Sequence, residues 1–193
     1  MKKIVLASNN KFKIKEIKDI LKEYEILTLN DIGYFKEIEE TGSTYLENAL
    51  IKAKTISDYL KTINLNYDVL ADDSGLSCLA LNDEPGIYSA RYASNHDFKL
   101  NRKKLIENLK GKDKSAYLKC ILVFYKNDGS YIHTEGKTFV RIIDEERGDT
   151  SNGYDAIIYS EELGKTFGEA KSEEINKMSH RYKALVKLKN LIG

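Results

Sequence analysis

Two pairs of adjacent carboxylates are the groups in this 193-residue chain best suited to chemistry. Glu39-Glu40 precedes Thr41-Gly42, and Asp72-Asp73 directly follows an apolar run. A hard divalent ion such as Mg²⁺ is held by one or two carboxylates and by substrate phosphates, while a further carboxylate can take a proton from water. Crowded carboxylates raise each other's pKa unless a cation lies between them. Together the pairs predict metal-assisted phosphoryl chemistry, although each alone also fits an exposed acidic run or a turn.

A further segment carries residues suited to binding phosphate. A short apolar run ends at Ala7, and a segment with helical spacing of apolar residues begins at Ile14. Between them stand Ser8, Asn9, Asn10, Lys11, Phe12 and Lys13. The N-terminus of a helix attracts anions through its free N–H groups, and lysine adds a full charge. Because the glycines of a Walker loop are missing, the segment is either another kind of phosphate cradle or an ordinary cap with solvated lysines.

Ser179-His180-Arg181, near the C-terminus, contains one of only three histidines. The arginine beside it can make a forked contact with a phosphate or a purine edge. The alternative is that Ser179 caps the last helix while His180 and Arg181 point to water. His96 and His133 have no partner at metal-ligand spacing, and we interpret both as structural.

The first half of the chain alternates strands and helices. Residues 4–7 predict a buried strand, and residues 26–29 can form a second one. A helix between them is predicted from its apolar positions, which are Ile14, Ile17, Leu21 and Tyr24. Another helix is expected after Thr44, which fits a capping box with Glu47.

The second half predicts paired strands. Residues 68–71 are strand-like and place Asp72-Asp73 at a strand end, where functional groups favour lying. A helix around 100–109 precedes the strongest strand, 117–125, which is apolar on both faces as in a central strand. A turn signal at 127–129 leads into a strand over 130–143, and a terminal helix ends near Leu191. We therefore predict an α/β fold with a mixed sheet.

Composition narrows the class of protein. Basic and acidic residues number 31 and 30, so the net charge of +1 gives no footprint for nucleic acid. No run approaches the ~20 apolar residues that cross a bilayer, and the N-terminal apolar run is too short for a signal peptide. Cys78 and Cys120 stand far apart, which argues against a zinc site and favours buried, reduced thiols. We expect one cytoplasmic domain over residues 1–193, without a nucleic-acid or membrane partner.

Seven short motifs, spread over nearly the whole chain in a fixed order, resemble the inosine/xanthosine triphosphate pyrophosphatase family. They are Ser8 to Lys13 with Glu16; Glu39-Glu40-Thr41-Gly42; Glu47-Asn48-Ala49 with Lys52-Ala53; Ala71 to Leu76; Pro85 to Tyr92; Gly153-Tyr154-Asp155; and Ser179-His180-Arg181. Each motif is weak alone, but their order and intervals together make the resemblance specific.

The resemblance implies hydrolysis of ITP, dITP or XTP to the monophosphate and pyrophosphate, with Mg²⁺, in a homodimer. It implies an elongated mixed sheet flanked by helices, in two lobes with a substrate cleft between them. Asp73 resembles the general base with Asp72 beside it, and Glu39 and Asp73 resemble the metal carboxylates, with Glu40 as the adjacent alternative. The resemblance also implies the substrate contacts. They are Ser8 to Lys13 and Lys52 for the triphosphate, Ser74 as another substrate contact, and Asn152, Gly153, Tyr154, Asp155, His180 and Arg181 for the base.

This chain departs from the family pattern at two positions, both near residues implied to contact the nucleobase. The family usually has phenylalanine before Gly-Tyr-Asp, where this chain has Asn152, and a lysine where it has Ile175. Loss of a stacking ring would weaken base binding by ~1 kcal/mol, unless Lys171, Lys177 or another aromatic residue compensates. We therefore expect the pyrophosphatase chemistry with weaker or altered purine selectivity.

Two alternatives stay open from the sequence. One is a Maf-like pyrophosphatase with a different nucleotide preference. The other is a nucleotide-binding module without catalysis, which the intact carboxylate pairs disfavour because binding alone needs no base.

Overall fold

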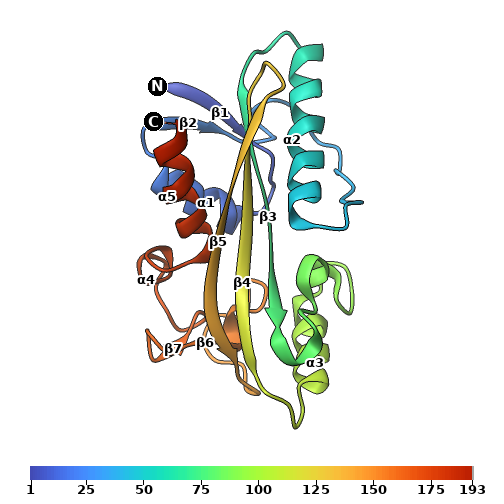
Figure 1. Cartoon of the computed structure of the whole chain (residues 1–193), viewed down its shortest axis with the longest axis vertical. Helices are drawn as coiled ribbons and strands as arrows, with labels where there is room; N and C mark the ends of the chain where they lie inside the picture. The colour runs from blue at the N-terminus through green and yellow to red at the C-terminus, as the bar shows by residue number, and fades with distance from the viewer. Residues whose placement is uncertain (193) are drawn as a thin grey trace. The chain divides into compact units, whose positions relative to one another are not determined.

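The computed structural model describes residues 1–192, and it confirms the α/β class (Figure 1). The strands are β1 (Lys2–Leu6), β2 (Tyr24–Leu27), β3 (Asp68–Cys78), β4 (Ser115–Tyr125), β5 (Tyr131–Ile142), β6 (Ile158–Ser160) and β7 (Lys165–Thr166). The α-helices are α1 (Lys11–Ile20), α2 (Tyr45–Thr62), α3 (Phe98–Asn108), α4 (Ser172–Asn176) and α5 (His180–Ile192). Three short 3-10 helices lie at Leu79–Leu81, Gly86–Arg91 and Asp155–Ile157.

The seven strands form one mixed sheet in the order β2-β1-β3-β4-β5-β6-β7. β1 runs parallel to both β2 and β3, whereas β6 is antiparallel to β5 and to β7. The register of β1 on β3 runs from Ile4 opposite Asp68 to Leu6 opposite Leu70. β3 therefore continues well beyond the last residue of β1.

The chain divides into two compact units, each with its own core. Unit 1 contains residues 1–73, 120–136 and the segment from 181 to the C-terminus, and unit 2 contains residues 74–119 and 137–180. A single functional domain over residues 1–193 stays a prediction. Cys78 and Cys120 are buried free thiols, as expected.

Unit 1 has two hydrophobic clusters, one on each face of its strands. Figure 1 shows α2 on one side of β1 and β3, and α1 with α5 on the other. Since successive side chains of a strand point to opposite faces, β3 contributes to both clusters. Leu70 packs with α1 and α5, whereas Val69 and Ala71 pack with α2. The Thr134 hydroxyl donates to the Ala184 carbonyl oxygen at 2.9 Å, which fixes α5 against β5.

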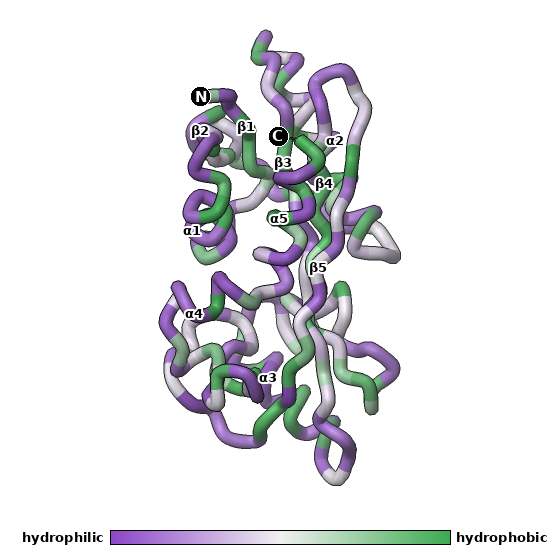
Figure 2. Tube along the Cα trace, turned by 60° about the vertical axis from the view of Figure 1, so that its left-hand side comes forward, coloured by the Kyte–Doolittle hydropathy of each residue, from purple (hydrophilic) through white to green (hydrophobic). Residues whose placement is uncertain are grey.

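The helix starts in unit 1 follow the expected capping chemistry. Thr44 and Glu47 form a reciprocal capping box at the start of α2, as the sequence predicts. The helix predicted through Tyr24 is too long, because α1 ends at Ile20 and Tyr24 opens β2. Leu21 and Tyr24 still pack in the same cluster as Ile17, which explains why the apolar spacing continues past the helix end. Figure 2 shows hydrophilic and hydrophobic residues alternating around the turns of α1.

Unit 2 has a single cluster in which α3 packs on its strands. The Tyr154 hydroxyl is buried and donates to the Ser89 carbonyl oxygen at 2.8 Å. The Thr138 hydroxyl donates to the Met178 carbonyl oxygen at 2.7 Å, so the segment after α4 is held against β5. Ile175 is partly buried against this cluster.

No helix within residues 1–192 is both long enough and apolar enough to cross a membrane.

Candidate active site

Asp72 and Asp73 lie inside β3, not at its end as the sequence predicted. Ser74-Gly75 is a common turn pair, but here the strand continues beside β4 as far as Cys78 with mostly buried residues. β1, in contrast, has already ended opposite Leu70. The two aspartates therefore occupy the part of β3 just beyond the carboxyl end of β1, which is where open parallel sheets place ligands.

The two aspartates point to opposite faces of β3, because they are consecutive residues of a strand. Their contacts follow this division: Asp72 meets α1 and α5, whereas Asp73 meets α2. The expectation that the pair crowds together and raises its own pKa values is therefore wrong. The cations that pair directly with the two carboxylates differ, although Lys13 and Lys52 each lower the pKa of both.

Asp72 is almost completely buried, at 1% exposure, and is held by two cations. Lys13 Nζ lies 2.9 Å from its Oδ2, and Nη2 of Arg181 lies 3.3 Å from the same oxygen. Arg181, itself 7% exposed, also binds the Glu16 carboxylate through Nη1. Burial alone would raise the pKa of Asp72, but the charges of Lys13 and Arg181 outweigh it and hold that pKa well below its usual range.

The lowered pKa of Asp72 predicts an acid-sensitive contribution to stability. Such a group stabilises the fold above the pKa of the unfolded chain, ~4, and loses this contribution as the pH falls towards its folded pKa. We expect the free energy of unfolding of the wild type to exceed that of Asp72→Asn at pH 7, and the gap to narrow between about pH 5 and pH 3. Urea unfolding at a series of pH values measures both; a gap that stays constant over this range would contradict the prediction.

Asp73 faces three polar residues on the other side of β3. Lys52 Nζ lies 3.9 Å from its Oδ1 and 2.6 Å from Oε1 of Glu40, and Asn48 donates from Nδ2 to Oδ2 of Asp73 at 3.1 Å. Burial raises the pKa of Asp73 to about 6; Lys52 and Lys13 oppose the rise, and the charge of Glu40 adds to it. A carboxylate with a pKa close to neutrality is suited to accepting a proton from water.

The structure separates the two candidate glutamates. Glu40 is half-buried and shares Lys52 with Asp73, whereas Glu39 is exposed. The carboxylates that lie together are therefore those of Glu40 and Asp73. Among residues 1–192, no group of three or more histidine, cysteine or acidic side chains is placed to hold a metal ion, so an ion here would need oxygens from its substrate.

The segment from Ser8 to Lys13 combines a cap with one inward-facing charge. Asn10 caps α1, since its Oδ1 accepts from the N–H groups of Phe12 and Lys13 at 3.0 and 3.2 Å. Those two amides are thus occupied, and the helix-cap interpretation is right for Asn10. Asn9, Lys11 and Phe12 are exposed, and Ser8 accepts from the Asn10 N–H group. Lys13 alone in this segment pairs with a buried carboxylate.

The residues predicted for the nucleobase belong to both units. Arg181 is in unit 1, where its guanidinium binds Asp72 and Glu16. It is buried, so the interpretation that it points to water is wrong. His180 belongs to unit 2, and so do the four residues of the Gly-rich loop, Asn152, Gly153, Tyr154 and Asp155. Ser74, predicted as another substrate contact, is in unit 2 as well.

The Gly-rich loop of unit 2 is internally ordered. Nδ2 of Asn152 donates to the Asp155 carboxylate at 2.7 Å, and Gly153 has a φ of 51°. Arg102 of α3, 3% exposed, donates from Nη1 to the carbonyl oxygens of Thr150 and Gly153 at 3.2 and 2.6 Å. The side chain of Asn152 is therefore engaged within the loop.

Glu16, Asn48 and Arg102 also contact the site or the Gly-rich loop, and their roles were not predicted from the sequence. Glu16 and Asn48 belong to the motifs that carry the family resemblance. Each lies one helical turn from a lysine, Lys13 and Lys52 respectively, and so shares a helix face with it. That spacing could have indicated them. Arg102 had no signal beyond an arginine in an otherwise ordinary helix.

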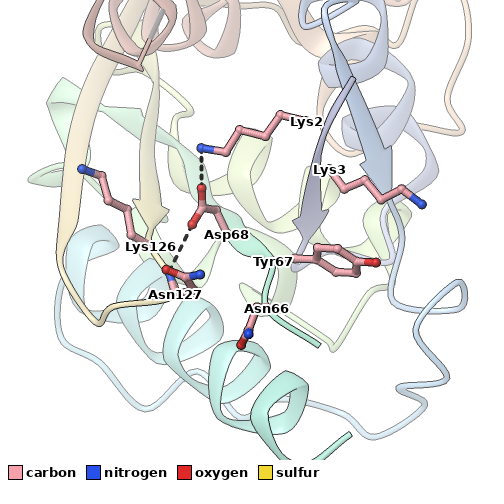
Figure 3. Close-up of a pocket in the computed structure, with 7 residues that line it drawn as sticks. All are labelled: Lys2, Lys3, Asn66, Tyr67, Asp68, Lys126 and Asn127. Carbon is pink, nitrogen blue, oxygen red and sulfur yellow. Dashed lines mark hydrogen bonds and ion pairs between the residues drawn. The ribbon is translucent and has the colours of Figure 1, made fainter. Parts of the chain in front are cut away.

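A pocket of about 470 Å³ opens elsewhere in unit 1, at the amino ends of β1 and β3 (Figure 3). Lys2 pairs with Asp68 at 2.6 Å inside it, while Lys3 and Lys126 point away from this pair. None of the predicted site residues lines the pocket. Its carboxylate, Asp68, is bound by Lys2 and by the Asn127 N–H group, so we place the candidate site at Asp72, Asp73 and Glu40.

Comparison with known proteins gives one consistent result. A family model described as the Ham1 family matches residues 4–191. The dITP/XTP pyrophosphatase of Clostridium perfringens is 45% identical over 100% of this chain and 98% of its own length, and that of Bacillus subtilis is 40% identical over 100% and 98%. The solved structure of the Staphylococcus aureus Ham1 protein is similar with a TM-score of 0.86 and 36% identity, over 99% of this chain and 98% of that one.

Proposed function

Since this chain belongs to the Ham1 family, we propose that it hydrolyses non-standard purine nucleoside triphosphates, namely ITP, dITP and XTP, to the monophosphate and pyrophosphate. It is a nucleoside triphosphate diphosphatase, which keeps these nucleotides out of DNA and RNA. Full-length similarity to dITP/XTP pyrophosphatases supports the reaction. The structural observation that supports a site for this reaction is the buried Asp73, which lies among Lys52, Glu40 and Asn48.

Asp73 is the general base of the proposed reaction. Water attacks a phosphorus of the α–β anhydride, its proton passes to the Asp73 carboxylate, and the bond to the bridging oxygen breaks to release pyrophosphate. The raised pKa of Asp73 makes it a better proton acceptor than an ordinary aspartate. Lys52 lies within 3.9 Å of it and provides positive charge for a phosphate oxygen.

Asp72 has a different role, which its environment defines. Its carboxylate stays ionised between Lys13 and Arg181. It cannot readily accept a proton, but it fixes the direction of Lys13, whose side chain remains 19% exposed. Lys13 then offers its charge to a phosphate from a defined position.

A divalent ion fits the carboxylates of Glu40 and Asp73. Both supply hard oxygen donors, and the charge of Glu40 raises the pKa of Asp73, a cost that a cation between them would remove. We propose that Glu40 and Asp73, with the substrate phosphates, hold Mg²⁺, and that Glu39 is outside the set. When bound, the ion neutralises charge on the phosphates under attack.

Purine selection is proposed to reside in Asn152 to Asp155, with Ser74, His180 and Arg181 as further substrate contacts. Hydrogen-bond donors that face the 6-oxo group of hypoxanthine or xanthine would leave the amino group of adenine unpaired and so reject ATP. Two observations support altered selectivity. The Asn152 side chain donates to Asp155 and has no aromatic ring to stack on the base. Ile175, where the family pattern has lysine, is a partly buried apolar residue packed against the core of unit 2.

A panel of purified triphosphates, assayed for pyrophosphate and for phosphate separately, tests the function. We expect pyrophosphate from dITP, ITP and XTP in the presence of Mg²⁺, with kcat/KM above that for dATP and dGTP by a smaller factor than in family members that have the aromatic residue. Preference for a pyrimidine or modified nucleotide would indicate the Maf-like alternative. Binding without release of any product would indicate a non-catalytic module. A fully family-like preference for dITP would refute altered selectivity alone.

The homodimer, the cytoplasmic location and the absence of a nucleic-acid partner stay predictions from the sequence and the resemblance.

A further inference from the structure

We infer that Asn48 is a positioning residue for the reaction, because one side-chain amide holds both the Asp73 carboxylate and the loop that carries Glu40. The inference rests on the proposed function, in which Asp73 is the base. Asn48 is on the first turn of α2 and is 0% exposed. Nothing in helix formation requires an asparagine at a buried position, where the side chain costs free energy unless both of its polar ends are bound.

Both ends of the Asn48 amide are bound, in a direction that the partners determine. The Gly42 N–H group donates to Oδ1 at 2.8 Å, and Nδ2 donates to Oδ2 of Asp73 at 3.1 Å. A backbone N–H can only donate, and an ionised carboxylate can only accept. Flipping the amide would therefore break both bonds, so the side chain has one stable orientation.

The loop contacts leave no room for a side chain at position 42. A Cβ on Gly42 would lie 2.7 Å from Oδ1 of Asn48 and 2.6 Å from Cβ of Glu47. The next two N–H groups, of Ser43 and Thr44, donate to Oε2 of Glu47 at 2.6 and 3.2 Å. Three successive amides are thus fixed on α2, two residues after Glu40, and the position of Glu40 depends on this attachment.

Asn48 therefore couples two carboxylates that arrive from separate parts of the chain. Asp73 is provided by β3, Glu40 by the loop before α2, and the two share Lys52. Asn48 fixes one oxygen of Asp73 and the backbone near Glu40 at once. A displacement of a reacting group by ~1 Å can lower a rate by about 100-fold, so loss of this link should act on kcat more than on KM.

The substitution Asn48→Asp separates the two contacts. Its oxygen can still accept from the Gly42 N–H group, but it presents a carboxylate, not a donor, to Asp73. We expect kcat for dITP to fall by about 100-fold and KM to change by less than about threefold. Hydrogen exchange of the Gly42 amide, measured by NMR, should remain slow. In Asn48→Ser, which reaches neither partner, kcat should fall at least as far and the Gly42 amide should exchange fast.

Asn101 of α3 provides a matched control in unit 2. It is also 0% exposed, its Oδ1 accepts from the N–H groups of Ala93 and Ser94 at 2.6 and 3.0 Å, and its Nδ2 donates to the Ala90 carbonyl oxygen at 3.1 Å. Asn101→Asp makes the same chemical change in a loop clamp that has no carboxylate partner. We expect both Asn48→Asp and Asn101→Asp to lower Tm, but Asn101→Asp to keep kcat within about threefold of the wild type.

The outcomes separate this inference from the proposed function. Wild-type kcat in either folded Asn48 variant, or an equal loss of kcat in Asn101→Asp, would overturn the positioning role while leaving the function standing. If Asn48→Asp does not fold, Asn48→Ser decides by the same measurements. A wild type that releases no pyrophosphate would refute the function, and the Gly42 exchange rates would still show whether Asn48 clamps the loop.

Discussion

Replacing Asp73 with asparagine should lower kcat for pyrophosphate release by roughly 10²–10⁴-fold, the usual contribution of a general base. The amide has nearly the shape of the carboxylate and can still accept from Nδ2 of Asn48, but it cannot take a proton from water. Because the change also removes a proposed metal oxygen, the Mg²⁺ concentration at half-maximal rate should rise. Steady-state kinetics with dITP over a range of Mg²⁺ concentrations measures both effects.

The substitution Asp73→Asn, which should lower activity, should not lower the stability of the fold. The pKa of Asp73 is raised to about 6, so the fold favours the protonated carboxyl. Stability from this group is complete below the unfolded pKa of ~4 and is lost as the pH rises through about 6. A neutral asparagine avoids that loss, and at pH 8 we expect the Tm of Asp73→Asn to equal or exceed that of the wild type. An inactive variant with an unchanged or raised Tm cannot be explained by misfolding.

Asp68 offers the control for Asp73, since it is another buried aspartate of β3 and lies away from the candidate site. Its carboxylate binds Lys2 and accepts from the Asn127 N–H group at the amino end of the strand. Asp68→Asn should keep kcat within about threefold of the wild type. Full activity in Asp73→Asn would remove Asp73 as the base, and a comparable loss in both variants would show that the assay reports strand stability.

Local sequence signals predicted most of the elements correctly. The Thr44–Glu47 capping box, the central strand β4 and the turn before β5 each depend on residues within a few positions of one another. Local signals gave a wrong prediction where pairing between distant strands decides the structure. The strand predicted over residues 68–71 is too short, because pairing with β4 keeps β3 extended through the two aspartates as far as Cys78.

The partners of the carboxylates could not be predicted from spacing. Arg181 and Asp72 are 109 positions apart, and only the fold brings α5 to the face of β3 on which Asp72 lies. The same fold decides that Glu40, not Glu39, is beside Asp73. The resemblance indicated which residues matter, whereas the assignment of each to one face of the strand required the structure.

The two faces of β3 explain how neighbouring aspartates can have opposite proton affinities. Asp72 faces two cations that hold its pKa down, and Asp73 faces Lys52 together with the competing charge of Glu40. Pairs of acids whose environments separate their pKa values commonly divide acid–base work from charge stabilisation. In this chain the division follows directly from the alternation of side chains along one strand.

Replacing Arg181 with methionine should destabilise the fold more than any other single change at the site. Arg181 is buried between the carboxylates of Asp72 and Glu16, and its loss would remove the cation that these two acids share. Breaking a buried pair in this way costs about 3–5 kcal/mol, which corresponds to a fall in Tm on the order of 10 °C. Urea and thermal unfolding at pH 7 measure the two quantities.

Arg102→Met is the control for Arg181→Met. It removes a buried arginine without leaving a buried carboxylate unpaired. Arg102 is as buried as Arg181, but its carboxylate partner Glu146 has a side chain that is 36% exposed and can be hydrated when left alone. Its loss should cost about 1–3 kcal/mol, for the unpaired backbone carbonyls.

Adding Asp72→Asn to Arg181→Met should recover part of the lost stability, because the double variant no longer buries the charge of Asp72. Additive losses in the double variant would mean that Asp72 does not depend on Arg181, and the electrostatic account of this face would then be wrong.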